Sequence, residues 1–271
     1  MRIIMNKKGI INTKINKIGI IDADLIGNGT RHPNLALMKI SAYYKGKGKE
    51  VTLLTSYESI PKYEYVFISK VFSYTCLPEN FSDYKSITKG GTGFFEDGGE
   101  NLPEEIEHHF PDYHLYDEYI EKQIANGKSR KYYNDYIDFS IGFATRGCFR
   151  KCDFCVNKKY DRAIFHSHLN EWVDPERKGI YLWDDNIFAY EKWREVFDEL
   201  EKIGKPFQFR QGIDGTNHKV LPVRSPKHHF LLLKWQLTLL RSEDNWRWHK
   251  TKPLARHTSL KDRPNFPDYY L

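Results

Sequence analysis

Residues 141–160 read IGFATRGCFRKCDFCVNKKY. Within them Cys148, Cys152 and Cys155 have the spacing C-x3-C-x2-C, and the apolar run 137–144 leads into the first cysteine. Three thiolates on one short loop can hold three irons of an iron–sulfur cube, because soft sulfur ligands suit such clusters. Most clusters of this type take four protein ligands, so a set of three leaves one iron open for another ligand.

This spacing, with Phe154 directly before the last cysteine and TRG at 145–147 before the first, resembles the signature of the radical S-adenosylmethionine (SAM) enzymes. In that family three cysteines hold a [4Fe-4S] cluster, and SAM binds the fourth iron through its amino and carboxylate groups. An electron from the cluster cleaves SAM to a 5′-deoxyadenosyl radical, which abstracts hydrogen from a substrate. The resemblance implies that Cys148, Cys152 and Cys155 ligate the cluster and that Phe154 lies near the adenine.

Other uses of the cysteines compete with this one. Disulfides are disfavoured, because we expect no secretory signal and three cysteines so close together pair poorly. Zinc is the serious rival, since His166 and His168 follow Cys152-x2-Cys155. Only one residue separates the two histidines, however, whereas zinc fingers usually leave three to five. Unligated structural cysteines fit least well, because the surrounding loop is polar.

The composition bounds the remaining possibilities. A chain of 271 residues with 40% hydrophobic content has room for one large domain or two smaller ones. No apolar run approaches the roughly twenty residues that span a bilayer, so we expect no membrane segment. An oxygen-sensitive cluster on reduced thiols favours a cytoplasmic location.

The positive charge is concentrated at one end of the chain. Residues 215–271 hold 11 of the 42 Lys and Arg residues but only 4 of the 36 Asp and Glu residues, which leaves the rest of the chain balanced. A basic surface organised across the fold would be better support for binding a nucleic-acid backbone. Any nucleic-acid contact would therefore use this basic tail.

The first 120 residues alternate between strand and helix patterns. Short apolar runs at 17–22, 50–55 and 65–72 are typical of buried parallel strands. Residues 33–44 suit a helix with Pro33 in its first turn. This rhythm predicts a parallel, doubly wound sheet, so the fold class is α/β.

Residues 1–120 also resemble the degenerate cobalamin-binding-like, Rossmann-like domain found ahead of many radical SAM cores. The matching segment is HPNLALMKISAYYKGKGKEVTLL at 32–54, which implies the first crossover helix and the second strand. The sequence lacks Asp-x-His-x-x-Gly, whose histidine ligates cobalt in many carriers, so we do not expect bound cobalamin. The glycines of GGTG at 90–93 could cradle a phosphate, but a tight turn is the favoured interpretation.

Residues 121–136 are polar and predict an exposed linker, and residues 137–214 predict a partial β/α barrel. Its expected elements are strands at 138–144, 179–183 and 206–210 and a helix at 191–203. A β/α barrel builds its site from residues at the carboxyl ends of its strands.

Polar residues follow two of these strands: Asp184, Asp185, Asn186, Arg210 and Gln211. By resemblance, the first three lie where the family contacts the amino group and ribose of SAM, whose donors need carboxylate or amide acceptors. Alternatively, Asp184 or Asp185 caps the following helix. Arg210 and Gln211 are candidates for contact with SAM or substrate.

The family core repeats strand and helix six times, but only three repeats can be traced before composition changes abruptly at Gly215. Residues 215–271 are either a divergent appendage or the product of a shifted or recombined reading frame, and the abrupt change favours the second. We therefore expect a radical SAM enzyme with a shortened core, whose activity is in question. Its electron donor would be a protein such as a flavodoxin or ferredoxin, and no residue specifies the substrate. The alternative is a non-enzymatic zinc- or cluster-binding module that contacts nucleic acid through its basic tail.

Overall fold

The structure is a computed structural model of the chain. It describes residues 14–30, 32–96, 99–152, 155 and 160–211. The chain divides into two units, residues 1–215 and 216–271, and all the described residues belong to the first. The predictions for Phe154, for residues 212–214 of the partial barrel and for the tail at 215–271 therefore lie outside the described residues.

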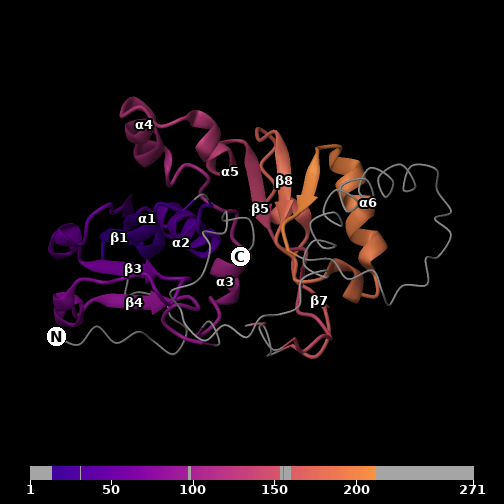
Figure 1. Ribbon diagram of the computed structural model, residues 1–271, viewed down its shortest axis with the longest axis horizontal. Coiled ribbons are helices and arrows are strands. Elements are labelled where there is room, and N and C mark those ends of the chain that lie inside the picture. Colours follow the sequence, from indigo (N-terminus) through magenta and orange to yellow (C-terminus); the bar gives the residue numbers. More distant parts are fainter. Residues whose placement is uncertain (1–13, 31, 97–98, 153–154, 156–159, 212–271) are drawn as a thin grey trace, which may run out of the picture. The chain divides into compact units, whose positions relative to one another are not determined.

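The first sheet has four parallel strands in the order β2-β1-β3-β4 (Figure 1). Their bounds are β1 Lys17–Asp22, β2 Glu50–Leu53, β3 Tyr65–Ser69 and β4 Ile87–Gly90. Ile18 on β1 lies opposite Val51 on β2 and Tyr65 on β3. β3 is buried along its whole length, as is β1 after its first residue, which explains why both sequences are continuous apolar runs.

Helices and turns cover both faces of this sheet. The helices of this part are α1 Ala23–Asn28, α2 Leu35–Gly46, α3 Glu104–Glu107 and α4 Asp117–Ala125, with the 3-10 helices η1 Tyr57–Lys62 and η2 Glu79–Asp83. α2 begins after Pro33 rather than with it, because the Asn34 side chain caps the helix by accepting from Leu37 N. Among the described residues, no helix combines the length and the apolar character needed to cross a bilayer.

The second sheet has three described strands, all parallel, in the order β5-β8-β9. Its elements are β5 Phe139–Gly142, β8 Gly179–Leu182 and β9 Phe207–Phe209, with α6 Trp193–Ile203 and the short helices η4 Leu169–Glu171 and η5 Ile187–Ala189. A separate antiparallel pair, β6 Thr145–Arg146 and β7 Ile164–Phe165, carries the cysteine loop. Val196, Phe197 and Leu200 of α6 pack in the core of the second sheet. The predicted α/β class with parallel sheets is confirmed.

Residues 121–136 are mostly exposed, as expected, but they form helical segments rather than an irregular linker. They include the end of α4, the 3-10 helix η3 Arg130–Tyr133 and most of α5 Asn134–Ile137. Tyr133 and Tyr136 are buried, and Tyr136 Oη lies 3.0 and 3.1 Å from the carbonyl oxygens of Thr30 and His32. Two aromatic side chains thus anchor a segment whose other residues are mostly polar.

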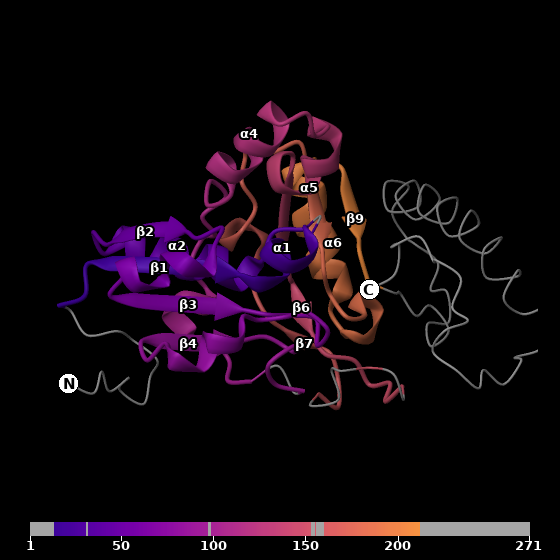
Figure 2. The same cartoon turned by 60° about the vertical axis from the view of Figure 1, so that its left-hand side comes forward.

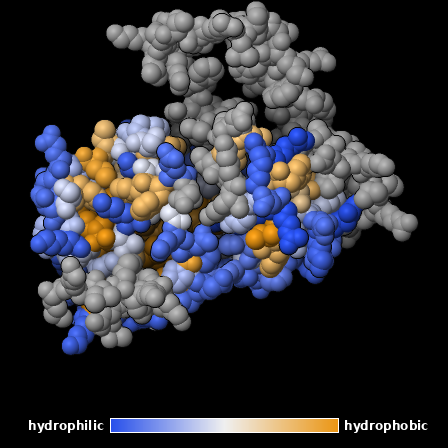
Figure 3. Space-filling model, turned by 90° about the horizontal axis from the view of Figure 1, so that it is seen from below, coloured by the Kyte–Doolittle hydropathy of each residue, from blue (hydrophilic) through white to orange (hydrophobic). Residues whose placement is uncertain are grey.

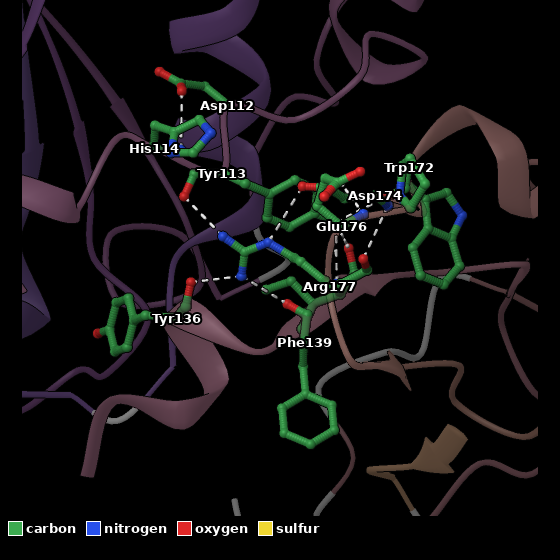
Figure 4. A network of polar contacts seen from close by, with 12 residues as sticks. Asp112, Tyr113, His114, Tyr136, Phe139, Trp172, Asp174, Glu176 and Arg177 are labelled. Carbon is green, nitrogen blue, oxygen red and sulfur yellow. Dashed lines mark hydrogen bonds and ion pairs between the residues drawn. The ribbon is translucent and has the colours of Figure 1, made fainter. Parts of the chain in front are cut away.

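Arg177 is a buried cation that ties this segment to the second sheet. Its Nη1 donates to the carbonyl oxygens of Tyr136 (2.6 Å) and Phe139 (3.1 Å) (Figure 4). Its Nη2 donates to the carbonyl oxygen of Tyr113 at 2.9 Å, and its guanidinium lies 4.2 Å from the centre of the Tyr113 ring. Burial lowers the pKa of Arg177. The charge is tolerated because three carbonyl oxygens accept from it.

Tyr113 continues this junction into β5. Its hydroxyl donates to the carbonyl oxygen of Trp172 (2.6 Å) and accepts from Ile141 N (3.1 Å). The Trp172 ring lies so close to Gly142 that a Cβ at Gly142 would overlap it. Gly142 therefore allows the Trp172 ring to pack closely against β5, shortly before the cysteine loop.

The surface of the described part is mixed. Figure 3 shows hydrophobic patches separated by hydrophilic side chains on one face. The large exposed hydrophobic residues are Val71, Tyr74, Phe95, Phe110, Ile124, Tyr132, Ile164 and Phe165.

Replacing Arg177 tests the junction. Arg177→Met should lower the free energy of unfolding by about 3 kcal/mol or more, because three buried carbonyl oxygens lose their donor. Arg194→Met is the matched control, since Arg194 is exposed on α6, and it should shift the urea midpoint little. Equal shifts in chemical denaturation would contradict the role given to Arg177.

Candidate functional site

The cysteine loop is the centre of the candidate site. Cys148, Cys152 and Cys155 are half-buried, and none is in a disulfide. Cys148 Sγ accepts hydrogen bonds from Arg150 N (3.4 Å) and Asn186 Nδ2 (3.6 Å), and Cys155 N donates to Cys152 O (3.0 Å). The described residues contain no group of three or more His, Cys, Asp or Glu side chains close enough together to hold a metal ion. Residues 153–154 and 156–159 of this loop, Phe154 among them, are outside that description.

Gly147 makes the turn into the first cysteine. Its φ is +92°, a conformation that side chains rarely adopt. A Cβ there would come within 2.6 Å of Arg162 O and of Tyr160 Cβ. Gly147 N donates to Asp185 Oδ2 at 2.7 Å. Backbone conformation, close packing and a carboxylate together fix where the loop starts.

Asp184 supports the same loop from the end of β8. It is buried, and its Oδ1 accepts from both the backbone N (2.6 Å) and the hydroxyl (2.6 Å) of Thr145. Oδ2 lies 3.3 Å from the donor Ala144 N. Burial raises the pKa of Asp184 to about 6, although these hydrogen bonds oppose the shift. Both carboxylate oxygens are therefore engaged by the protein.

The three polar residues after β8 thus make separate hydrogen bonds. Asp184 accepts from Thr145, Asp185 accepts from Gly147, and Asn186 donates to Cys148. The capping role considered for Asp184 or Asp185 is not observed, because the next helix, η5, has Asn186 at its N-cap with no side-chain cap bond. The structure brings the predicted group to the cysteine loop, and its contact with SAM stays a prediction.

Arg210 follows β9 and turns toward other residues. Its guanidinium lies 4.6 Å from the centre of the Tyr181 ring, and Nη2 is 3.5 Å from Asp135 Oδ2 and 3.4 Å from His32 Nε2. His32 Nδ1 lies close to Asp135 Oδ2. Arg210 thus joins the loop after α1 to the carboxyl edge of the second sheet. Gln211 is exposed, and no contact with the cysteines is seen for either predicted residue in the described part of the chain.

A charged cluster that the sequence did not predict lies at the base of the β6–β7 pair. Glu107 Oε1 lies 2.9 Å from Lys39 Nζ, 3.0 Å from His166 Nε2 and 3.8 Å from Arg146 Nη2. Burial alone would raise the pKa of Glu107, but the His166 hydrogen bond and the cations lower it to about 2. One carboxylate from α3 thus links α2 to β6 and to the residue directly after β7. A lysine at a buried helix position, Lys39, was the available signal.

The two histidines of the zinc interpretation are paired with different carboxylates. His166 contacts Glu107, whereas His168 Nδ1 lies 2.7 Å from Glu199 Oε1. The hydrogen bond to Glu199 raises the pKa of His168. This pairing gives no support to a zinc site built from these histidines.

The glycine turn after β4 uses its own backbone donors. Gly93 N donates to Lys70 O (2.8 Å), and Phe94 N and Phe95 N both donate to Gly91 O (3.1 Å). Gly91 has a φ of +96°, and a Cβ there would overlap Lys70 O. This geometry agrees with a tight turn, because the Gly93 N–H, a donor that a phosphate could use, is already bonded to Lys70 O.

No family model, curated protein or solved structure matches this chain. The residues and geometry of the site are therefore the basis for assigning a function.

Removing the Asp184 carboxylate should loosen the cysteine loop. Asp184→Ala leaves two buried donors of Thr145 without an acceptor, so we expect a loss of about 2–4 kcal/mol in the free energy of unfolding at pH 7. Asp83→Ala removes an exposed carboxylate in η2 and should leave stability unchanged. Urea denaturation measures both, and an Asp184→Ala protein as stable as its control would refute the role of Asp184.

Glu107 makes stability depend on acid pH. A pKa lowered from 4.5 to about 2 means that its contribution is present above pH 4.5 and is lost as pH falls toward 2. The wild-type protein should therefore exceed Glu107→Gln by about 3 kcal/mol at pH 7, and the difference should shrink between pH 5 and pH 3. Glu104→Gln, on the exposed side of α3, is the control. A difference that stays constant with pH, measured by thermal unfolding, would exclude this coupling.

Proposed function

We propose that this chain is a radical SAM enzyme. Its first sheet would be the Rossmann-like domain and β5, β8 and β9 the first three strands of a partial β/α barrel. The observation that carries the proposal is the contact between the cysteine motif and the end of β8. Gly147 donates to Asp185 and Asn186 donates to Cys148, so the motif lies at the carboxyl edge of the parallel sheet. That edge is where β/α barrels build their sites.

The type of ligand suits a [4Fe-4S] cluster, but the three thiols are not gathered into one group in the described structure, so they would have to move together to hold it. Three half-buried cysteine thiols come from one short loop, and sulfur ligands are those that such clusters require. Hydrogen bonds to ligand sulfurs tune cluster potential, and Cys148 Sγ already accepts two. When bound, the cluster with SAM would supply the reductive cleavage that starts radical chemistry.

The residues of the chain hold and orient this site. Cys148, Cys152 and Cys155 would ligate iron, and Asp185 and Asn186 would keep the loop and one side of SAM in place. Asp184 would support the loop indirectly, through the hydrogen bonds that it accepts from Thr145. Phe154, by resemblance, would lie near the adenine.

Arg210 would have a structural role. Its contacts with Asp135 and His32 connect the two halves of the described unit. The electron donor would be a flavodoxin or ferredoxin, the location cytoplasmic and the substrate open. We propose no bound cobalamin.

Anaerobic reconstitution with iron and sulfide tests the cluster. The wild-type protein should turn brown, and Cys148→Ser should lose most of its iron and visible absorbance because one ligand is missing. Cys76→Ser is the matched control, since Cys76 is exposed and outside the motif, and it should retain the cluster.

The second half of the experiment tests SAM cleavage. Reduction of the brown protein with SAM present should release 5′-deoxyadenosine. A colourless protein with stoichiometric zinc would overturn the proposal, and a brown protein that never cleaves SAM would remove the enzymatic part.

A further inference from the structure

Cys152 and Cys155 form a C-x-x-C pair within the cysteine loop. Cys155 N donates to Cys152 O at 3.0 Å. A hydrogen bond from residue i+3 to residue i closes a turn whose end Cα atoms lie less than about 7 Å apart. Disulfides join residues whose Cα atoms are about 4.4–6.8 Å apart. The backbone thus brings the two cysteines within the range of a disulfide, although neither is in one in this structure.

Cys148 is held by different contacts. Its Sγ accepts from Asn186 Nδ2 at 3.6 Å and from Arg150 N at 3.4 Å, and Gly147, directly before it, donates to Asp185. These contacts attach Cys148 to the residues that follow β8. Among the described residues, no three metal-ligating side chains lie together. The three cysteines thus divide into one that is anchored beside the second sheet and two that share a turn.

The pair is within reach of a small oxidant. Cys152 and Cys155 are half-buried, so each is partly accessible to solvent. Figure 2 shows β6 and β7, the strands on either side of the loop, side by side at the lower edge of the described unit. Oxidation of the pair therefore requires no opening of either sheet.

We propose that Cys152 and Cys155 form a reversible disulfide, which withdraws two of the three sulfur ligands of the loop. A low-molecular-weight disulfide such as oxidised glutathione supplies the oxidising equivalents. One cysteine attacks this reagent and releases one small thiol, and the other cysteine then attacks the mixed disulfide and releases the second. In balance, two protein thiols and one small disulfide give one protein disulfide and two small thiols, which carry away both protons.

The bond would change metal binding without changing the fold. Only Cys148 would remain as a sulfur ligand, whereas the hydrogen bonds that anchor Cys148 and Gly147 do not involve the pair. Such a reversible bond differs from the structural disulfides that three closely spaced cysteines disfavour, because disulfides in reducing compartments are usually transient or redox-sensing. Formation of the bond is independent of the proposed function; its effect on the cluster rests on that function.

Thiol mapping tests the bond. The full chain, reduced and free of metal, is incubated without oxygen in oxidised glutathione, alkylated with iodoacetamide and digested for mass spectrometry. Cys152 and Cys155 should be joined to each other, and Cys148 and Cys76 should carry the alkyl label. At about 0.1 mM oxidised glutathione the internal disulfide should exceed glutathione-bound pair by at least about tenfold, because a thiol on the same short loop has a millimolar effective concentration. Dithiothreitol should reverse the reaction.

Matched variants and a metal probe separate the two parts of the proposal. Cys148→Ser should form the same bond, whereas Cys152→Ser and Cys155→Ser should retain glutathione because no second thiol displaces it. Cadmium(II), a soft ion that thiolates bind, is then titrated into the reduced and the oxidised wild-type protein without added thiol. The oxidised form should bind it at least about tenfold more weakly, because two of three sulfur ligands are lost. Urea midpoints of the two forms should agree.

Several results would overturn the proposal. These are glutathione that stays on Cys152 or Cys155 in the wild-type protein, a disulfide that includes Cys148, or equal cadmium binding by the two forms. Failure of the proposed function would look different. In that case the disulfide would form as described, but the reduced protein would assemble no iron–sulfur cluster.

Discussion

Asp184 accepts the backbone N–H and the hydroxyl of Thr145 through one oxygen, in a site with almost no access to water. A carboxylate in such surroundings needs donors, and Thr145 and Ala144 supply them. Asp184 lies two residues after the end of β8, which pairs with β5, so these bonds connect the second sheet to the start of the cysteine loop. The start of the cysteine loop is therefore fixed by the completed sheet.

The strands that the sequence predicts best are those buried on both faces. Residues 17–22 and 65–69 are apolar almost throughout, and such runs permit little besides a central parallel strand. α6 was predictable because its apolar residues follow the helical period. β4 was missed, since Ile-Thr-Lys-Gly is short and half-exposed and becomes a strand only through pairing with β3. The helices at 121–136 were missed because the few residues that bury them are tyrosines within a polar segment.

The candidate site, like the fold, could be predicted from the sequence only in part. Cysteine spacing is a local property, and the carboxyl ends of adjacent parallel strands always meet at one edge, so Asp184, Asp185 and Asn186 could be placed near the loop in advance. The roles within that group could not, because they depend on which donor each carboxylate meets. Arg210 shows the difficulty most clearly. Its position after β9 suits a ligand contact, yet Asp135 and His32, distant in sequence, engage its guanidinium.

Two cations, Lys39 and Arg146, are largely buried at the base of the cysteine loop. Burial lowers the pKa of Lys39 and of Arg146, which shows how unfavourable their environment is for a cation, and only the acceptors around them compensate. Apolar residues of similar volume often replace such a cluster with no loss, or a gain, of stability. Stability alone therefore gives little reason for Glu107 to join Lys39, Arg146 and His166. The cluster joins Arg146 of β6 and His166, which follows β7, to one carboxylate, and it therefore restrains both ends of the segment that contains Cys148, Cys152 and Cys155.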